Sequence, residues 1–170
     1  MPYVFLDFEA SSLSKQSYPI EVGWVHEDGT GEGHLIRPAP GWTDWDEGAE
    51  LIHHISRQRL LAEGERHDAV CSRMLPLFET ATVLCSAPSW DGHWLSMLLR
   101  ASGLPRHLHR LADSEIAFRE AASVKPGGDA GVEARIAAAR AKVGALPADH
   151  RAEADARRDW AVWRAIVEAA

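Results

Sequence analysis

The sequence is short of cysteine, of long apolar runs and of positive charge, and each shortage excludes a class of protein. Its two cysteines, Cys71 and Cys85, are too few for a disulfide framework, and their apolar surroundings predict buried, reduced thiols. No apolar run approaches the ~18 residues of a membrane-spanning helix, so we expect no membrane partner. The N-terminus lacks a basic region followed by an apolar stretch; we therefore expect no signal peptide and a cytoplasmic location.

The charge balance narrows the range of partners. The chain has 18 lysines and arginines against 25 aspartates and glutamates, which gives a formal net charge of −7. Proteins that coat nucleic acid non-specifically usually carry basic surfaces, so this balance disfavours such a protein. It is compatible with an enzyme that binds only a few phosphates through a metal ion.

The length and composition are typical of one soluble globular domain. The chain has 170 residues, of which 46% are apolar and 25% are charged. We find no internal repeat and no second domain, so residues 1–170 are expected to form a single domain.

The hydrophobic pattern predicts three strands at the start of the chain, followed by alternating helices and strands. An antiparallel meander is expected from strands at 3–7, 18–25 and 33–38. A loop at 39–50 and short helical pieces around 50–63 follow. The remaining strands are expected at 81–87 and 108–113, with helices at 67–80, 91–102, from Ser114, 132–143 and 150–168, and a break at 123–131. This order predicts an α/β fold with a five-stranded mixed sheet flanked by helices.

The stretch YVFLDFEASSL, residues 3–13, ends its apolar run in two carboxylates. Asp7 and Glu9 share one face of the strand if the strand continues that far. Two like charges at the end of a sheet repel each other, and a divalent cation with oxygen ligands offsets that repulsion. The alternative is that both side chains cap the strand in solvent.

Two further stretches contribute titratable groups. Asp91 follows the 81–87 strand at the start of an amphipathic helix, where an acid in the first turn also complements the helix dipole. His150 and Asp155 begin the last helix, among small alanines that allow another backbone to approach closely. The alternative for this segment is a solvated, charged helix start. The buried face of the helix is then expected to carry Trp160, Trp163 and Val167.

Together these stretches resemble the DEDDh family of 3′–5′ exonucleases, which includes the proofreading subunit of bacterial DNA polymerase III, ribonuclease T and oligoribonuclease. DFEASSL resembles the motif D-x-E-T-T-G-L, and IHHIS resembles I-H-G-I-[ST]. APSWDGHWL resembles N-A-x-F-D-x-x-F-L, and HRAEADA matches H-x-A-x-x-D-A. The four matches occur in the family order, from Asp7 to Asp155. The resemblance implies a ribonuclease-H-like fold.

The resemblance also implies a two-metal exonuclease. Two divalent cations, Mg²⁺ or Mn²⁺, would activate the attacking water and stabilise the leaving 3′ oxygen. The residues that would hold them are Asp7, Glu9, Asp91 and Asp155. His150 would be the general base, because the pKa of a histidine lies near working pH.

Three departures from the family pattern leave this set intact. Ala10, Ser11 and Ser12 stand where the family often has Thr-Thr-Gly, Ala87 replaces a frequent Asn, and His54 replaces a Gly. Because none of them removes a metal ligand or the base, we expect an active enzyme.

The substrate implied by the resemblance is a single-stranded 3′ end or a short oligonucleotide, of DNA or RNA. In this family apolar and aromatic side chains wedge the terminal bases, because stacking tolerates any sequence. The residues placed at the substrate are Phe8, Ser11, Ser12, Leu13, Ile52 and His53. For Trp42 and Trp45, core packing and base contact both remain open. Homodimers occur in the family, but no feature of the sequence fixes an interface.

Two other functions remain open. One is a metal-dependent phosphoesterase that acts on small nucleotides and shares the fold. The other is a non-catalytic nucleic-acid-binding module. A pure binder has no need to keep a repulsive set of four acids and a histidine, which argues against the second.

Overall fold

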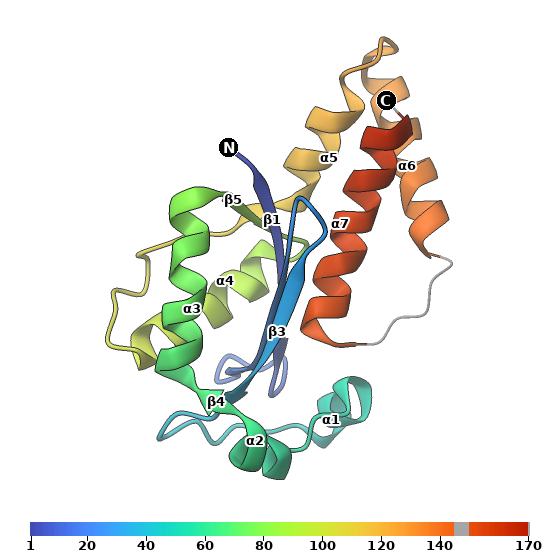
Figure 1. Ribbon diagram of the computed structural model, residues 1–170. Helices are drawn as coiled ribbons and strands as arrows, with labels where there is room; N and C mark the ends of the chain where they lie inside the picture. Colours follow the sequence, from blue (N-terminus) through green and yellow to red (C-terminus); the bar gives the residue numbers. More distant parts are fainter. Residues whose placement is uncertain (145–149, 170) are drawn as a thin grey trace.

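The computed structural model describes residues 1–144 and 150–169. Its strands form one six-stranded sheet in the order β4-β3-β2-β1-β5-β6 (Figure 1). The pairs β1–β2 and β2–β3 are antiparallel, whereas β4, β5 and β6 run parallel to β3, β1 and β5. In chain order the strands are β1 (Tyr3–Ala10), β2 (Pro19–His26), β3 (Gly31–Arg37), β4 (Glu65–Arg66), β5 (Thr82–Cys85) and β6 (Ala112–Asp113).

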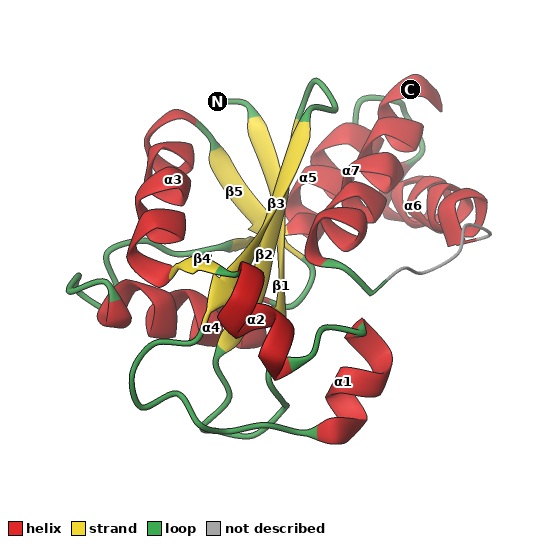
Figure 2. Cartoon of the chain, turned by 60° about the horizontal axis from the view of Figure 1, so that its bottom comes forward, coloured by secondary structure: helices red, strands yellow, loops and turns green. Residues whose placement is uncertain are grey.

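The helices cover both faces of the sheet and one of its ends (Figure 2). In chain order they are α1 (Glu47–His53), α2 (Arg57–Glu63), α3 (His67–Thr80), α4 (Pro88–Ala101), α5 (Ser114–Ala122), α6 (Gly128–Gly144) and α7 (Ala152–Ala169). The helices α3 and α4 pack on one face, and α5, α6 and α7 pack on the other.

Alternation along β1 supplies side chains to both cores. Val4 and Phe8 pack with α3 and α4, whereas Phe5 packs with the helices of the opposite face. Asp7 and Glu9 follow Phe5 at intervals of two residues, so they lie on the face that α7 covers. The strand therefore turns its apolar side to one layer and two carboxylates toward the other.

The structure confirms the predicted fold class, with one correction to the strand count. The sheet has six strands instead of five, because β4 adds an edge strand of two residues. A strand of two residues is too short to show alternation, so no sequence pattern indicates it. The strand predicted at 108–113 is also shorter in the structure, where β6 covers only Ala112 and Asp113.

Several element boundaries also differ from the prediction. β1 continues to Ala10, beyond the predicted end at residue 7. α1 begins inside the predicted loop, where the Asp46 side chain accepts a hydrogen bond from Gly48 N. α4 begins at Pro88, earlier than the predicted residue 91, because proline suits the first position of a helix.

The last two helices need corrections as well. α6 begins at Gly128, within the predicted break. α7 begins at Ala152, because His150 has a φ of 46°, which a right-handed helix cannot contain. Val167 is 38% exposed and does not belong to the buried face. That face consists of Ala152, Ala156, Val162, Trp163 and Ile166, and Trp160 packs against the same core while partly buried.

The structure also bears on the expectations for the two cysteines and for membrane-spanning helices. Cys71 and Cys85 are buried and free, as predicted. Among the described helices, none combines the length and the apolar character that crossing a membrane requires.

Candidate active site

Three carboxylates from opposite ends of the chain meet beside β1. Asp7 and Glu9 lie on β1, and Asp155 lies in the first turn of α7. One carboxylate oxygen of each lies within 4.8 Å of the others. The continuation of β1 to Ala10 satisfies the condition under which the first two share a face. The structure thus brings together three of the four predicted acids.

The electrostatics of this acid cluster disfavour three bare negative charges. Burial, followed by the charges of Asp91 and Glu9, raises the pKa of Asp7 well above its ordinary value. Burial, followed by the charge of Asp155, raises the pKa of Glu9 to about 8. Asp7 and Glu9 therefore resist ionisation because of their burial and their charged neighbours.

Asp91, the fourth predicted acid, stands next to the cluster and not within it. Its side chain is 1% exposed and accepts a hydrogen bond from Ala87 N, at 3.3 Å. Burial raises its pKa to about 6. Its charge raises the pKa of Asp7, and a hydrogen bond from the backbone of Phe8, the residue after Asp7, opposes the rise in its own pKa.

Asp159 is a fifth acid that the sequence reasoning missed. Burial raises its pKa to about 6, and a hydrogen bond from Ser114 opposes that shift. Its charge raises the pKa of both Asp7 and Asp91. A signal was present, because residues four apart on a helix share a face, and Asp159 follows Asp155 by four.

His150 is not part of the acid cluster in this structure. It is exposed, and it precedes α7 with the left-handed φ of 46°. The next residue, Arg151, is held by an ion pair with Glu21, so His150 stays close to the start of α7.

Glu21 holds Arg151 and the first residue of α7. It is 3% exposed, lies opposite Glu9 in the β1–β2 register, and pairs with the Arg151 guanidinium. Arg151 Nε donates to it at 2.9 and 3.1 Å, and Ala152 N donates at 3.0 Å. A buried carboxylate thus fixes the segment between His150 and Asp155. A single acid within a predicted strand gave no signal for this role.

Gly23 allows α7 to approach the sheet. A Cβ at this position would lie 2.1 Å from the backbone nitrogen of Glu153 and 2.4 Å from its Cα. Only a residue without a side chain fits, so the glycine sets the height at which Asp155 meets β1. Gly23 is the register partner of Asp7.

A cavity of about 420 Å³ opens beside Glu9. Its wall includes Phe8, Ser12, Leu13, Ile52 and His53, five of the six residues that the resemblance placed at the substrate. Leu13 and Ile52 are 71% and 55% exposed, so their apolar side chains are accessible at this wall. Ser11 is fully buried and does not line the cavity.

His53, in the wall of this cavity, has a buried hydrogen-bond donor. Its Nδ1 accepts a hydrogen bond from Ile55 N at 3.1 Å, so the proton of the neutral ring is on Nε2. Within the described residues that Nε2 is buried and has no hydrogen-bond partner. Burial lowers the pKa of the ring, which favours the neutral form.

The remaining candidates take structural positions. Trp42 stacks on Tyr18 with ring centroids 5.1 Å apart, and Trp45 Nε1 donates to Glu50 at 2.9 Å. Neither tryptophan lines the cavity beside Glu9. His54 ends α1 with a φ of 56°.

The donor set of the acid cluster suits a hard divalent cation. All ligand atoms that it offers are carboxylate oxygens, which Mg²⁺ and Mn²⁺ prefer. A cation would also relieve the repulsion that raises the pKa of Asp7 and Glu9. The residues present therefore fit a metal site.

Comparison with known proteins gives no sequence relative. No family model matches the chain, and no curated protein is significantly similar to it.

Comparison with solved structures does give clear matches. Exonuclease I from Methylocaldum szegediense has a TM-score of 0.73 and 19% identity, covering 98% of this chain and 40% of that chain. E. coli exonuclease I in complex with a dT13 oligonucleotide has a TM-score of 0.67 and 19% identity, covering 94% and 39%. The zinc ion bound form of the E. coli exonuclease I–ssDNA complex has a TM-score of 0.67 and 18% identity, with the same coverage. The chain spans about two fifths of the length of these proteins. At this identity the likeness establishes the fold, and the chain has the α/β, ribonuclease-H-like fold found in exonuclease I.

Proposed function

We propose that this protein is a metal-dependent 3′–5′ exonuclease of the DEDDh type, which releases nucleoside monophosphates from single-stranded DNA or RNA. One observation carries the proposal: Glu9 belongs both to the acid cluster, with Asp7 and Asp155, and to the wall of a cavity of about 420 Å³. Cavities of about 300–1,000 Å³ suit small ligands, a class that includes a nucleotide. Such a nuclease needs metal-binding acids next to a site for the terminal nucleotide.

In this proposal Asp7, Glu9, Asp91 and Asp155 hold two divalent cations, Mg²⁺ or Mn²⁺. When bound, the cations supply an activated water and stabilise the leaving oxygen. The raised pKa values of Asp7, Glu9 and Asp91 support it, because such groups ionise readily only when a cation compensates their charge. The existence of a zinc-bound exonuclease I–ssDNA structure is consistent with a metal at this fold.

His150 acts as the general base in this proposal. The Glu21–Arg151 pair fixes the chain directly after it, which keeps His150 near the start of α7, the helix that carries Asp155. There it accepts a proton from the attacking water. Hydrogen bonds of catalytic groups often form only in the substrate complex, so its exposed position is compatible with this role.

The 3′-terminal nucleotide occupies the cavity beside Glu9. The exposed side chains of Leu13 and Ile52 flank the base, as expected for stacking contacts without sequence preference. The His53 Nε2–H donates to an oxygen of the sugar or phosphate. Phe8 and Ser12 complete the wall, and Ser11 supports it by donating to Asp44.

Single-stranded nucleic acid is the partner that the comparisons support. Exonuclease I has been crystallised with dT13 and with dA16 oligonucleotides. Residues 1–170 would form a single exonuclease domain, and the properties of the longer exonuclease I chains are not assumed for it.

A digestion assay tests the proposal. A 5′-labelled oligo-dT or oligo-U should be shortened from its 3′ end in Mg²⁺ or Mn²⁺ and left intact in EDTA. Asp7→Asn and Asp155→Asn should each lower the rate about 10³-fold or more, since several kcal/mol of transition-state stabilisation depend on the metals. Asp129→Asn, a change to an exposed acid on α6, is the matched control and should retain the wild-type rate.

The same assay separates the alternative functions. Hydrolysis of a mononucleotide ester without any shortening of oligonucleotides would indicate a phosphoesterase. Oligonucleotide binding without hydrolysis under any metal condition would indicate a binding module. Wild-type digestion by the Asp7→Asn protein would contradict the metal site itself.

A further inference from the structure

The loop of residues 105–111, PRHLHRL, concentrates positive charge on an acidic protein. It carries two arginines and two histidines, Arg106, His107, His109 and Arg110, on a chain of net charge −7. All but His109 are exposed. Most other arginines pair with acids; these are Arg59, Arg66, Arg73, Arg119, Arg140, Arg151, Arg157 and Arg164. In the part of the chain that the structure describes, Arg106 and Arg110 form no ion pair with an acid.

The loop borders a hollow beside α4, the helix that carries Asp91. A cavity of about 240 Å³ separates its basic side chains from Pro88, Gly92 and Leu95 of α4. No acidic residue belongs to its described lining. Asp91 lies on the same turns of α4.

The positions of side chains around α4 show how Asp91 lies relative to the cavity beside Glu9 and the cavity beside the 105–111 loop. Successive helical residues are rotated by about 100°, so Trp94 lies roughly 60° to one side of Asp91, whereas Leu95 and Gly92 lie roughly 40° and 100° to the other. Trp94 lines the cavity beside Glu9, and Leu95 and Gly92 line the cavity beside the 105–111 loop. The acid therefore stands between the two cavities.

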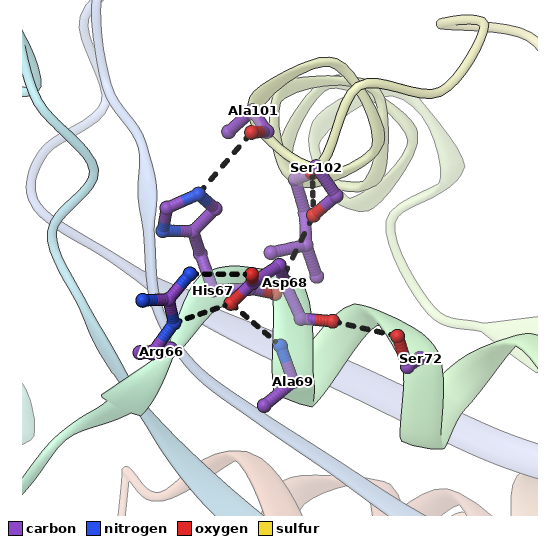
Figure 3. A network of polar contacts seen from close by, with 8 residues as sticks. Arg66, His67, Asp68, Ala69, Ser72, Ala101 and Ser102 are labelled. Atoms are coloured by element: carbon purple, nitrogen blue, oxygen red, sulfur yellow. Dashed lines mark hydrogen bonds and ion pairs between the residues drawn. The ribbon is translucent and has the colours of Figure 1, made fainter.

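Contacts just before the loop, shown in Figure 3, fix the end of α4 from which the loop departs. His67 Nε2 donates to Ala101 O at 3.2 Å, and Ser102 Oγ donates to Leu98 O at 2.9 Å and His67 O at 3.5 Å. These bonds join the end of α4 to the start of α3, immediately before the loop.

Further contacts hold the middle and the end of the loop. The His109 ring stacks on Phe78, with centroids 4.5 Å apart and planes 12° from parallel. After the loop, β6 pairs with β5. The basic side chains are thus presented from a backbone fixed at three places, which reduces the entropy lost on binding.

A second cavity near the acids fits an anion less well. It has a volume of about 420 Å³ and is lined by Arg140 and Arg158, but also by Asp113, Glu115 and Asp159. The charge of Arg140 is offset by its ion pair with Glu115. A strand of phosphates therefore finds more uncompensated positive charge at residues 105–111.

We propose that the 105–111 loop binds phosphates of the substrate strand on the 5′ side of the scissile bond. The inference rests on the proposed exonuclease function: the 3′ nucleotide enters the cavity beside Glu9, the scissile phosphate meets the acids, and the strand continues across α4. Contacts to phosphates act independently of sequence and lengthen the footprint of the enzyme. The loop would then favour oligonucleotides over dinucleotides.

Binding measured without hydrolysis tests this surface directly. Fluorescence anisotropy of labelled oligo-dT in EDTA, over a range of salt, should show weaker binding for the Arg106→Gln, Arg110→Gln protein than for wild type. The slope of log affinity against log salt should become shallower by about 0.7 for each lost phosphate contact. The control is the Arg59→Gln, Arg164→Gln protein, which loses the same charge from two exposed ion pairs and should keep the wild-type slope.

A kinetic comparison adds a second readout. In Mn²⁺ the loop variant should have a higher KM on a long oligonucleotide, while its turnover of a dinucleotide remains that of the wild type. Equal slopes for the loop variant and the control would overturn the proposal, as would an equal loss on dinucleotides. If the wild type binds oligonucleotide with the predicted salt dependence but hydrolyses nothing, the exonuclease proposal fails and the binding surface stands.

Discussion

Glu21 and Glu9 are register partners on adjacent strands, yet their surroundings differ. Glu21 has a guanidinium and a backbone N–H to compensate its charge, whereas Glu9 faces other carboxylates. Burial of a carboxylate is tolerated when such partners are present. Among the acids near β1, Glu21 is therefore structural, whereas Asp7 and Glu9, whose pKa values are raised, are candidates for metal binding.

Glu21→Gln tests this assignment. The change keeps the size of the side chain but removes the charge opposite Arg151, so the free energy of unfolding should fall by about 2 kcal/mol, less than for a fully buried pair because Arg151 is partly exposed. The melting temperature should fall by about 4–8 °C. Turnover should fall as well, because the segment between His150 and Asp155 loses its anchor.

Glu168→Gln is the matched control, since Glu168 pairs with Arg164 at the exposed surface. Its effect should stay under about 0.5 kcal/mol, as is usual for such pairs. Thermal scans and oligonucleotide turnover measure both variants. A Glu21→Gln protein that melts and turns over like the control would show that the buried pair has no positioning role.

At the scale of elements, the sequence predicts the long ones, overestimates the length of β6 and misses the two-residue strand β4. The helix at 67–80 and the meander of three strands carry enough periodic residues to be found, and both exist. β4 and β6 have two residues each and exist only because neighbouring strands offer hydrogen bonds. Such strands are set by tertiary packing, which no local pattern records.

The candidate site divides in a similar way. Asp7, Glu9 and Asp155 could be found because their spacing has a motif. Glu21 and Gly23 could not be found, because their roles depend on the contact between α7 and β2. The sequence around residues 21–23 contains no pattern that predicts this contact.

The close contact between α7 and β2 leads to a prediction for Gly23→Ala. The added Cβ would meet the backbone of Glu153 at 2.1 Å, and backbone cannot rotate away as a side chain can. α7 must shift, and a misplacement of about 1 Å at a catalytic group costs about 10²-fold in rate. We expect a loss of this order in turnover, together with a lower melting temperature.

Gly33→Ala supplies the comparison for this variant. Its Cβ would lie 3.2 Å from the Glu153 Cβ, a contact that a small adjustment relieves. That protein should keep most of its activity. Equal activity of the two alanine variants would mean that the height of α7 above the sheet does not matter to the site.

For the whole molecule, the acid cluster predicts how stability depends on pH. The pKa of Glu9 is about 8 in the folded protein against an ordinary value of 4.5, and that of Asp91 is also raised, to about 6. Between the ordinary pKa of these acids and their raised pKa in the folded protein, the folded state binds more protons than the unfolded state. The free energy of unfolding should therefore fall as the pH rises from about 4.5 to about 8. Metal-free protein should therefore melt lower at about pH 8 than at about pH 5.5.

Thermal scans in EDTA and in Mn²⁺ check this prediction. Mn²⁺ should raise the melting temperature most at the higher pH, where the carboxylates are free of protons. In the Asp7→Asn, Asp155→Asn protein the pH dependence should be weaker and the gain from Mn²⁺ small. A metal-free melting temperature that rises with pH across this range would mean that these acids have compensating partners.

The acid cluster joins the first strand of the fold to its last helix, and this has a consequence for synthesis. A chain emerges from the ribosome N-terminus first, so β1 is available long before α7. Until α7 packs on β1 and β2, Asp7 and Glu9 have no Asp155 beside them. A half-made chain, tethered to the messenger RNA that encodes it, therefore lacks the complete set of acids with which the proposed nuclease would cut.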